Sequence, residues 1–300
     1  MTATPTTDSS RKPGLARRLA IWLFPRRRLQ LGLLLATPLG WLAIVYLGSL
    51  GLLLLSAFWA NDLGGVQPFV WSLDAFETLF GNASYRTVAL RTLGVAVAVT
   101  LTDAVLAFPI AYYMARVASP RVRNAMVIAI LVPLWAAYLV KVYAWRTILQ
   151  GNGLFDAILE PLGIGQPWQG LKEDANSWLV LSYLWLPYMI LPLYAGLERI
   201  PNSLLEASAD LGGKARTTFR RVILPLSFPA LVAGSIFTFS LTLGDYITPD
   251  LVSDAKFIGN VIYDNSIVSP PLAAAFSLVP ITIMVVYLIV ARRLGAFESL

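Results

Sequence analysis

The stretch Glu206–Pro225, EASADLGGKARTTFRRVILP, decides how this chain folds. It is charged and broken by a Gly-Gly pair, whereas the segments beside it, WLVLSYLWLPYMILPLYAGL (178–197) and LSFPALVAGSIFTFSLTLG (226–244), contain no charged residue. Segments of that length and polarity are too apolar for a surface in water and long enough to cross a bilayer. The quoted stretch is therefore predicted to be a polar loop between two membrane spans.

The composition of the whole chain indicates a membrane protein. Of its 300 residues, 57% are hydrophobic and 13% are charged, and the mean hydropathy is +0.67; soluble domains average about 25% charged residues. Cysteine and histidine are absent, so thiolate and imidazole nucleophiles and metal ligands are excluded and an enzyme is disfavoured. We expect no metal site. The net charge of +6 fits the Lys and Arg that cytoplasmic loops collect, rather than binding to nucleic acid.

Six segments reach the roughly 20 apolar residues that a transmembrane helix needs. The predicted fold is an all-α membrane protein with spans at about 30–58, 89–115, 125–146, 177–198, 222–244 and 272–291. These spans form one transmembrane domain over residues 29–300. The preceding residues 1–28 form a basic tail, which either lies as a helix in the lipid headgroup layer or is solvated. Between the first two spans, LDAFETLF (73–80) is a candidate surface helix.

The distribution of Lys and Arg orients the spans. Of the 23 basic residues, six fall on the side opposite the termini, namely Arg86, Arg91, Lys141, Arg146, Lys172 and Lys256. Basic residues accumulate in cytoplasmic loops. Both termini, and with them the loop 199–225, are therefore predicted to be cytoplasmic.

The first part of this loop, IPNSLLEASADLGG (200–213), has the pattern of a short helix. Ser203 and Glu206 are spaced as a capping box, and Gly212 with Gly213 can end the helix in the left-handed conformation. A second helix, KARTTFRRVI (214–223), is predicted to follow and to enter the membrane at Pro225.

One face of the first helix is small to apolar, with Leu204, Ala207, Ser208 and Leu211 at helical spacing. A ridge of this kind either inserts into a groove on another protein or packs on the ends of the chain's own spans. The residues by themselves leave both alternatives open.

The spacing of the loop resembles the EAA loop of ABC importer permeases. Glu206-Ala207-Ser208, three residues, Gly212, nine residues and Val222-Ile223-Leu224-Pro225 match that pattern, with Ser208 replacing an Ala and Val222 replacing an Ile. LAFPIAYYMAR (106–116) and RRLGAF (292–297) also look like the permeases of spermidine/putrescine importers. The resemblance covers about residues 30–300.

This resemblance implies the type I importer fold, in a bacterial cytoplasmic (inner) membrane. It implies a cytoplasmic ATPase dimer, a second permease subunit and an extracytoplasmic substrate-binding protein as partners. The first loop helix would be the coupling helix, with Leu204, Glu206, Ala207, Asp210, Leu211 and Gly212 meeting the ATPase. The chain contains no G-x-x-x-x-G-K-[ST] motif, so ATP hydrolysis is assigned to the partner and no cofactor to this chain.

The resemblance also implies a polyamine as substrate. Permeases for ferric iron, sulfate and molybdate share the EAA loop, so another small substrate is the alternative. A secondary transporter would also have several spans, but it would leave the EAA loop unexplained.

Four residues are candidates for the substrate path. Asp103 is about halfway along the span 89–115, where a carboxylate is costly and is a functional candidate. The alternatives are protonation or a structural bond to a neighbouring helix; Lys141 on the third span is expected roughly 10 Å away in depth. Asp245 and Tyr246 occur in LGDYITPD (243–250), at the predicted outer end of the fifth span, with Asp250 as a weaker companion. By resemblance the position of Asp245 is acidic in polyamine permeases. Pro249 is expected to end the helix of the fifth span. The alternative for Asp245 is that its carboxylate caps the segment that follows.

Overall fold

The computed structural model describes residues 27–62, 65–150, 154, 157, 161 and 173–293. The chain divides into two compact units, Met1–Leu55 and Ser56–Leu300. This boundary lies near the end of the first span, whereas the sequence analysis placed a domain boundary after the basic tail, at residue 28. Nearly all of that tail lies outside the described residues, so its predicted interfacial helix remains a prediction.

The first unit is helical wherever it is described. It consists of α2 (Arg27–Trp41), the π-helical turn η1 (Leu42–Leu47) and α3 (Gly48–Ser56), the last of which ends just past the unit boundary. Residues Leu34–Ser56 are long and apolar enough to cross a membrane. The helix thus falls where the sequence predicts the first span.

The second unit begins with a hairpin that the all-α prediction did not include. Strand β1 (Trp59–Asp62) pairs antiparallel with β2 (Gly65–Trp71), with a register irregularity between Trp59 and Ala60. The surface helix predicted at 73–80 is present as α4 (Asp74–Gly81).

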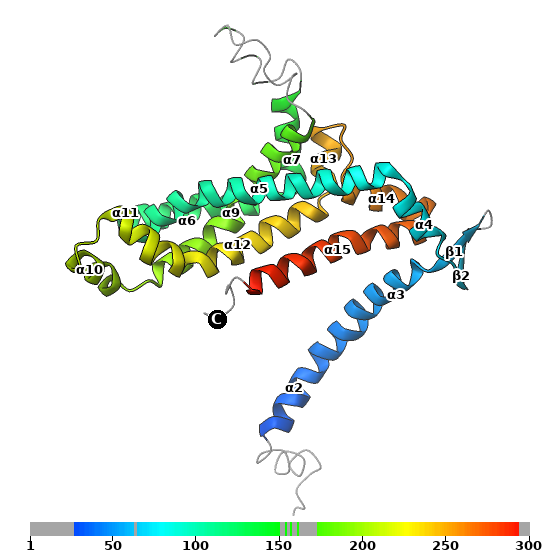
Figure 1. Cartoon of the computed structure of the whole chain (residues 1–300), viewed down its shortest axis with the longest axis horizontal. Helices are drawn as coiled ribbons and strands as arrows, with labels where there is room; N and C mark the ends of the chain where they lie inside the picture. The colour runs from blue at the N-terminus through cyan, green and yellow to red at the C-terminus, as the bar shows by residue number, and fades with distance from the viewer. Residues whose placement is uncertain are drawn as a thin grey trace, which may run out of the picture. The chain divides into compact units, whose positions relative to one another are not determined.

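Four long helices lie side by side in this unit (Figure 1): α5 (Ala83–Arg116), α9 (Glu173–Glu198), α12 (Leu224–Gly244) and α15 (Pro270–Arg293). Small residues let α9 and α12 approach closely. A Cβ on Gly234 would come within 2.7 Å of the Met189 sulfur, and one on Gly196 would overlap the Ala230 side chain. The close packing of these two helices therefore depends on glycine.

The span predicted at 125–146 is not a single straight helix. It is divided into α6 (Pro120–Trp135) and α7 (Tyr138–Leu149), which meet at an angle of 92°. Pro133 cannot donate a backbone hydrogen bond to the preceding turn, and Ala136 and Ala137 are extended, with ψ of 137° and 133°. The described residues contain five helices able to cross a membrane, or six if the bent pair counts as one span.

Short helices cover the two ends of the bundle (Figure 1). At one end lie α10 (Asn202–Asp210), α11 (Ala215–Thr218) and the π-helical turn η3 (Phe219–Ile223), which continues into α12. At the other end, α14 (Ile258–Val268) lies near α4, and α13 (Ile247–Val252) lies beside α7.

The fifth span ends where the sequence predicts, but Pro249 is not the residue that ends it. α12 stops at Gly244, and Pro249 lies inside α13 rather than ending α12. Proline is compatible with this position because it falls in the first turn of α13, where backbone N–H groups have no partner in the same helix.

Candidate functional site

The start of α10 is held by an arginine from another helix. The predicted capping box is wrong, because the N-cap residue is Pro201 and no side chain caps the helix. Instead, Arg116 at the end of α5 donates to the Asn202 side chain (2.8 Å) and to the backbone oxygens of Leu197 (2.5 Å) and Ile200 (2.6 Å). Arg116 is part of the segment LAFPIAYYMAR, which the sequence analysis noted. Its contacts with α10 could not be predicted, because its partners are distant in sequence.

The end of α10 is a Schellman motif, as the Gly-Gly pair predicted. The Gly212 N–H donates to Ala209 O and the Gly213 N–H to Ser208 O, both at 2.8 Å. Gly212 has a left-handed φ of +75°. A Cβ on Gly213 would come within 2.5 Å of Ser208 O, so both glycines are needed for this turn.

Ser208, the residue that departs from E-A-A, joins the two helices of the loop. Its hydroxyl is 2.8 Å from the hydroxyl of Thr218 in α11. Ser208 is half-buried and does not belong to the exposed ridge in which the sequence placed it.

The predicted ridge is otherwise exposed. Leu205 packs into the cluster of Phe219 and Ile223, whereas Leu204 is 43% exposed and Leu211 is 89% exposed. The remaining proposed coupling residues are also exposed, namely Glu206, Ala207, Asp210 and Gly212. α10 therefore packs on its own chain through one side and leaves the side with Leu204, Ala207 and Leu211 free for a partner.

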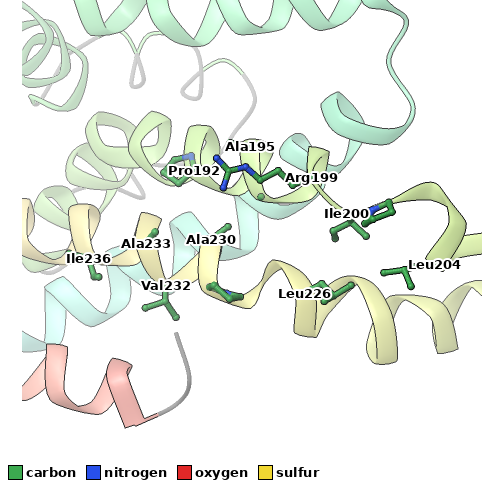
Figure 2. A pocket seen from close by; sticks show the side chains of 13 residues that line it. Pro192, Ala195, Arg199, Ile200, Leu204, Leu226, Ala230, Val232, Ala233 and Ile236 are labelled. Atoms are coloured by element: carbon green, nitrogen blue, oxygen red, sulfur yellow. The ribbon is translucent and has the colours of Figure 1, made fainter. Parts of the chain in front are cut away.

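An open pocket runs from Leu204 between α9 and α12 (Figure 2). Its volume is about 390 Å³, and its lining is apolar except for Arg199. Such a lining offers no carboxylate or aromatic face to a cation. This pocket is therefore not the place where the candidate path residues gather.

The carboxylate of Asp245 is fully engaged at the C-terminal end of α12. One oxygen accepts from the backbone N–H groups of Ile247 and Thr248, both at 3.0 Å. The other accepts from the hydroxyls of Tyr138 (2.5 Å) and Thr248 (3.0 Å). Asp245 is 8% exposed; burial raises the pKa of its carboxyl, and these hydrogen bonds oppose the rise. The bonds favour the capping alternative for Asp245 in this conformation.

The candidates Tyr246 and Asp250 lie on exposed surface. Tyr246 stacks on Tyr263 of α14, with ring centroids 4.8 Å apart. Asp250 is 3.5 Å from the Lys256 ammonium, which also pairs with Asp264 at 3.1 Å. The hydrogen bond to Asp264 raises the pKa of Lys256. Asp250 is therefore already matched by a cation, which the sequence did not predict.

Asp103 is fully buried on α5 and apart from these residues. Neither of its carboxylate oxygens has a hydrogen-bond partner, and no ion pair joins it to Lys141 among the described residues. The described part of the chain contains no group of three or more acidic residues arranged to hold a metal ion. The role of Asp103 in transport stays a prediction.

Comparisons with known proteins agree with the loop and the bundle. Residues 107–296 match the family described as binding-protein-dependent transport system inner membrane component. The chain is 46% identical over 310 residues, 98% of each chain, to the inner membrane ABC transporter permease protein YdcU of Escherichia coli (strain K12). It is 32% identical over 233 residues to the spermidine/putrescine transport system permease protein PotB of the same strain, covering 76% of this chain and 84% of that one.

The fold is also found among solved structures. The bacterial alginate ABC transporter in complex with its alginate pentasaccharide-bound periplasmic protein contains a chain that superposes with a TM-score of 0.69 at 18% identity, covering 92% of this chain and 98% of that one. The EAA-type loop, the helical bundle and these similarities lead to one conclusion: the chain belongs to the family of binding-protein-dependent transport system inner membrane components, the permeases of ABC importers.

Proposed function

We propose that this permease imports a cationic amine of the polyamine class across the cytoplasmic membrane. The chain's relative PotB, 32% identical, is named for spermidine and putrescine transport. Acidic and aromatic side chains at the outer end of α12, including Asp245, Tyr246 and Asp250, are of the kinds that ammonium groups bind. With both termini in the cytoplasm, as the basic residues predict, these side chains would meet the substrate first.

The partners follow from the exposed side of α10. In this proposal Leu204, Ala207 and Leu211 insert into a groove on a cytoplasmic ATPase subunit, and Asp210 forms a charge contact at its rim. A second permease subunit completes the path, and an extracytoplasmic protein delivers the substrate. One observation carries the proposed docking to the ATPase. α10 is fixed at both ends, yet its apolar side has no partner in the described chain.

Reconstitution tests the proposal. The permease, the ATPase, the second permease and the binding protein encoded beside it would be assembled in proteoliposomes, and uptake of radiolabelled putrescine, spermidine and sulfate would be measured. We expect ATP-dependent, saturable uptake of an amine and none of sulfate. Uptake of sulfate or ferric iron without uptake of either amine would refute the polyamine assignment. Failure of the ATPase to assemble with this chain would refute the coupling assignment separately.

A further inference from the structure

The middle of α9 carries three aromatic side chains, Tyr183, Trp185 and Tyr188. The candidate span in this helix is Asp174–Glu198, so all three lie within about 5 Å of its centre at 1.5 Å per residue. Tyr183 is 43% exposed, Tyr188 is 36% exposed and Trp185 is half-buried. Neither phenol hydroxyl has a hydrogen-bond partner among the described residues.

Contact with lipid would be unfavourable for the hydroxyls of Tyr183 and Tyr188. The hydrocarbon core contains no water to satisfy them, and an unpaired polar group there is costly. Tyr and Trp that face lipid accumulate instead at the two membrane interfaces. By contrast, Val285 and Ile289 of α15 are exposed but aliphatic. The exposed aromatic rings of α9 are therefore expected to meet water or another protein rather than lipid.

Two of these rings, those of Trp185 and Tyr188, belong to an aromatic cluster with Tyr138. Trp185 stacks on Tyr138, with ring centroids 6.0 Å apart and planes at 17°, and meets Tyr188 edge-on at 5.8 Å. Tyr138 is the residue that donates to the Asp245 carboxylate. The cluster thus begins at the acidic outer end of α12 and continues to the middle of α9.

Trp185 also packs towards α5, the helix that carries the buried carboxylate of Asp103. Trp185 packs against the cluster that contains Val99, and Asp103 follows Val99 by one helical turn. Both Asp103 oxygens and the Trp185 indole N–H lack hydrogen-bond partners. Trp185 therefore lies between the Tyr138 ring and the cluster that contains Val99, which is one helical turn from Asp103.

Tyr183 is a weaker candidate for contact with a cation. It lines a cavity between α6, α7 and α9 together with Lys141, and that ammonium would repel a second positive charge. Trp185 and Tyr188 do not line this cavity. The face formed by these two rings is therefore the better platform for a cation.

We propose that Trp185 and Tyr188 line the route of the substrate and bind its ammonium groups through the faces of their rings. A ring face attracts a cation through its quadrupole, more strongly where water is scarce. This inference rests on the proposed import of an amine, and it assigns the middle of α9 to the path of that substrate.

The chain contains no cysteine, so a single introduced cysteine reports its own surroundings. Tyr188→Cys would be prepared in the complete importer in membranes, with Val285→Cys as a control at an exposed mid-span position of α15. Reaction of this chain with a cationic methanethiosulfonate would be followed by its mass shift. Because that reagent needs water, we expect Tyr188→Cys to react faster than the control, on the order of tenfold. Equal, slow reaction at both positions would overturn the inference.

A second measurement separates the route from the substrate. Tyr188→Phe retains the ring and should support uptake, whereas Tyr188→Leu should reduce amine uptake by about tenfold. Normal uptake by Tyr188→Leu would overturn the role of the ring face. Spermidine should slow the labelling of Tyr188→Cys. Fast labelling that sulfate slows and spermidine does not would leave the water-lined route standing, but would overturn cation binding and with it the proposed function.

Discussion

Gly212 is the residue whose conformation the sequence predicts best. Its φ of +75° lies in the left-handed region, where a side chain with a Cβ is strained. Nothing lies within 4 Å of a Cβ built there, so the strain comes from the backbone alone. The effect of a substitution at Gly212 should therefore depend on how well the new residue tolerates the left-handed conformation.

Gly212→Val should strain or redirect the turn between α10 and α11, at a cost of about 1–2 kcal/mol. We expect substrate-stimulated ATP hydrolysis by the assembled importer to fall while the amount of permease in the membrane is unchanged. Gly212→Asn is the matched control, because Asn tolerates the left-handed region and should retain coupling. Full coupling in Gly212→Val would contradict the assignment of α10 as the coupling helix.

Asp245 illustrates a residue whose chemistry was recognised but whose partners were not. Asp245→Asn keeps an oxygen for the two backbone N–H groups but loses an acceptor for the Tyr138 and Thr248 hydroxyls. Leaving buried hydroxyls without a partner costs about 1–3 kcal/mol, so we expect a lower melting temperature of the purified permease. Tyr138→Phe is the control, since it removes one of these hydroxyls but keeps the carboxylate.

The two variants distinguish a structural role from a transport role for Asp245. If the carboxylate also meets the substrate, Asp245→Asn should reduce amine uptake strongly and Tyr138→Phe should reduce it little. Equal uptake by the two variants at equal membrane abundance would leave Asp245 with its structural role alone.

At the scale of elements, α10 is positioned by a contact with α5. Arg116 reaches two backbone oxygens and one side chain where α9 gives way to α10. The nearby Arg123–Glu198 pair, at 3.1 Å, is partly exposed. Exposed ion pairs contribute little to stability. We therefore expect Arg116 to contribute more than Arg123 to the position of α10.

Arg116→Lys should therefore disturb α10, because an ammonium cannot reproduce the forked contacts of a guanidinium. We expect weaker copurification of the ATPase with the permease and faster protease cleavage in the loop 199–225. Arg123→Ala should leave both measurements near wild type. Normal ATPase binding in Arg116→Lys would show that this contact is not required to present α10.

The break between α6 and α7 is the element that sequence reasoning missed. The pattern over 125–146 is apolar, and Ala136 and Ala137 are good helix formers. Tertiary contacts override that local preference: Tyr138, at the start of α7, is bonded to Asp245 and Thr248. A single apolar stretch can thus become two helices at 92°.

For the whole molecule, the sequence by itself determined the membrane class, the places of the apolar segments and the presence of the EAA-type loop. It also predicted the glycine turn that ends α10. Each of these depends on local properties, namely the hydropathy of about 20 consecutive residues, the spacing of a motif, or the backbone freedom of glycine.

The tertiary structure alone decided which polar groups are engaged. The carboxylate of Asp245 is occupied by Tyr138, 107 positions away in sequence. α10 is held by Arg116, which bonds to residues 81 and more positions away, and not by the predicted Ser203–Glu206 box. The rings of Tyr138 and Trp185 are stacked across 47 positions of sequence, from α7 to α9. Pairings over such distances depend on how helices pack, and helical periodicity reports the buried face of each helix but not its neighbour.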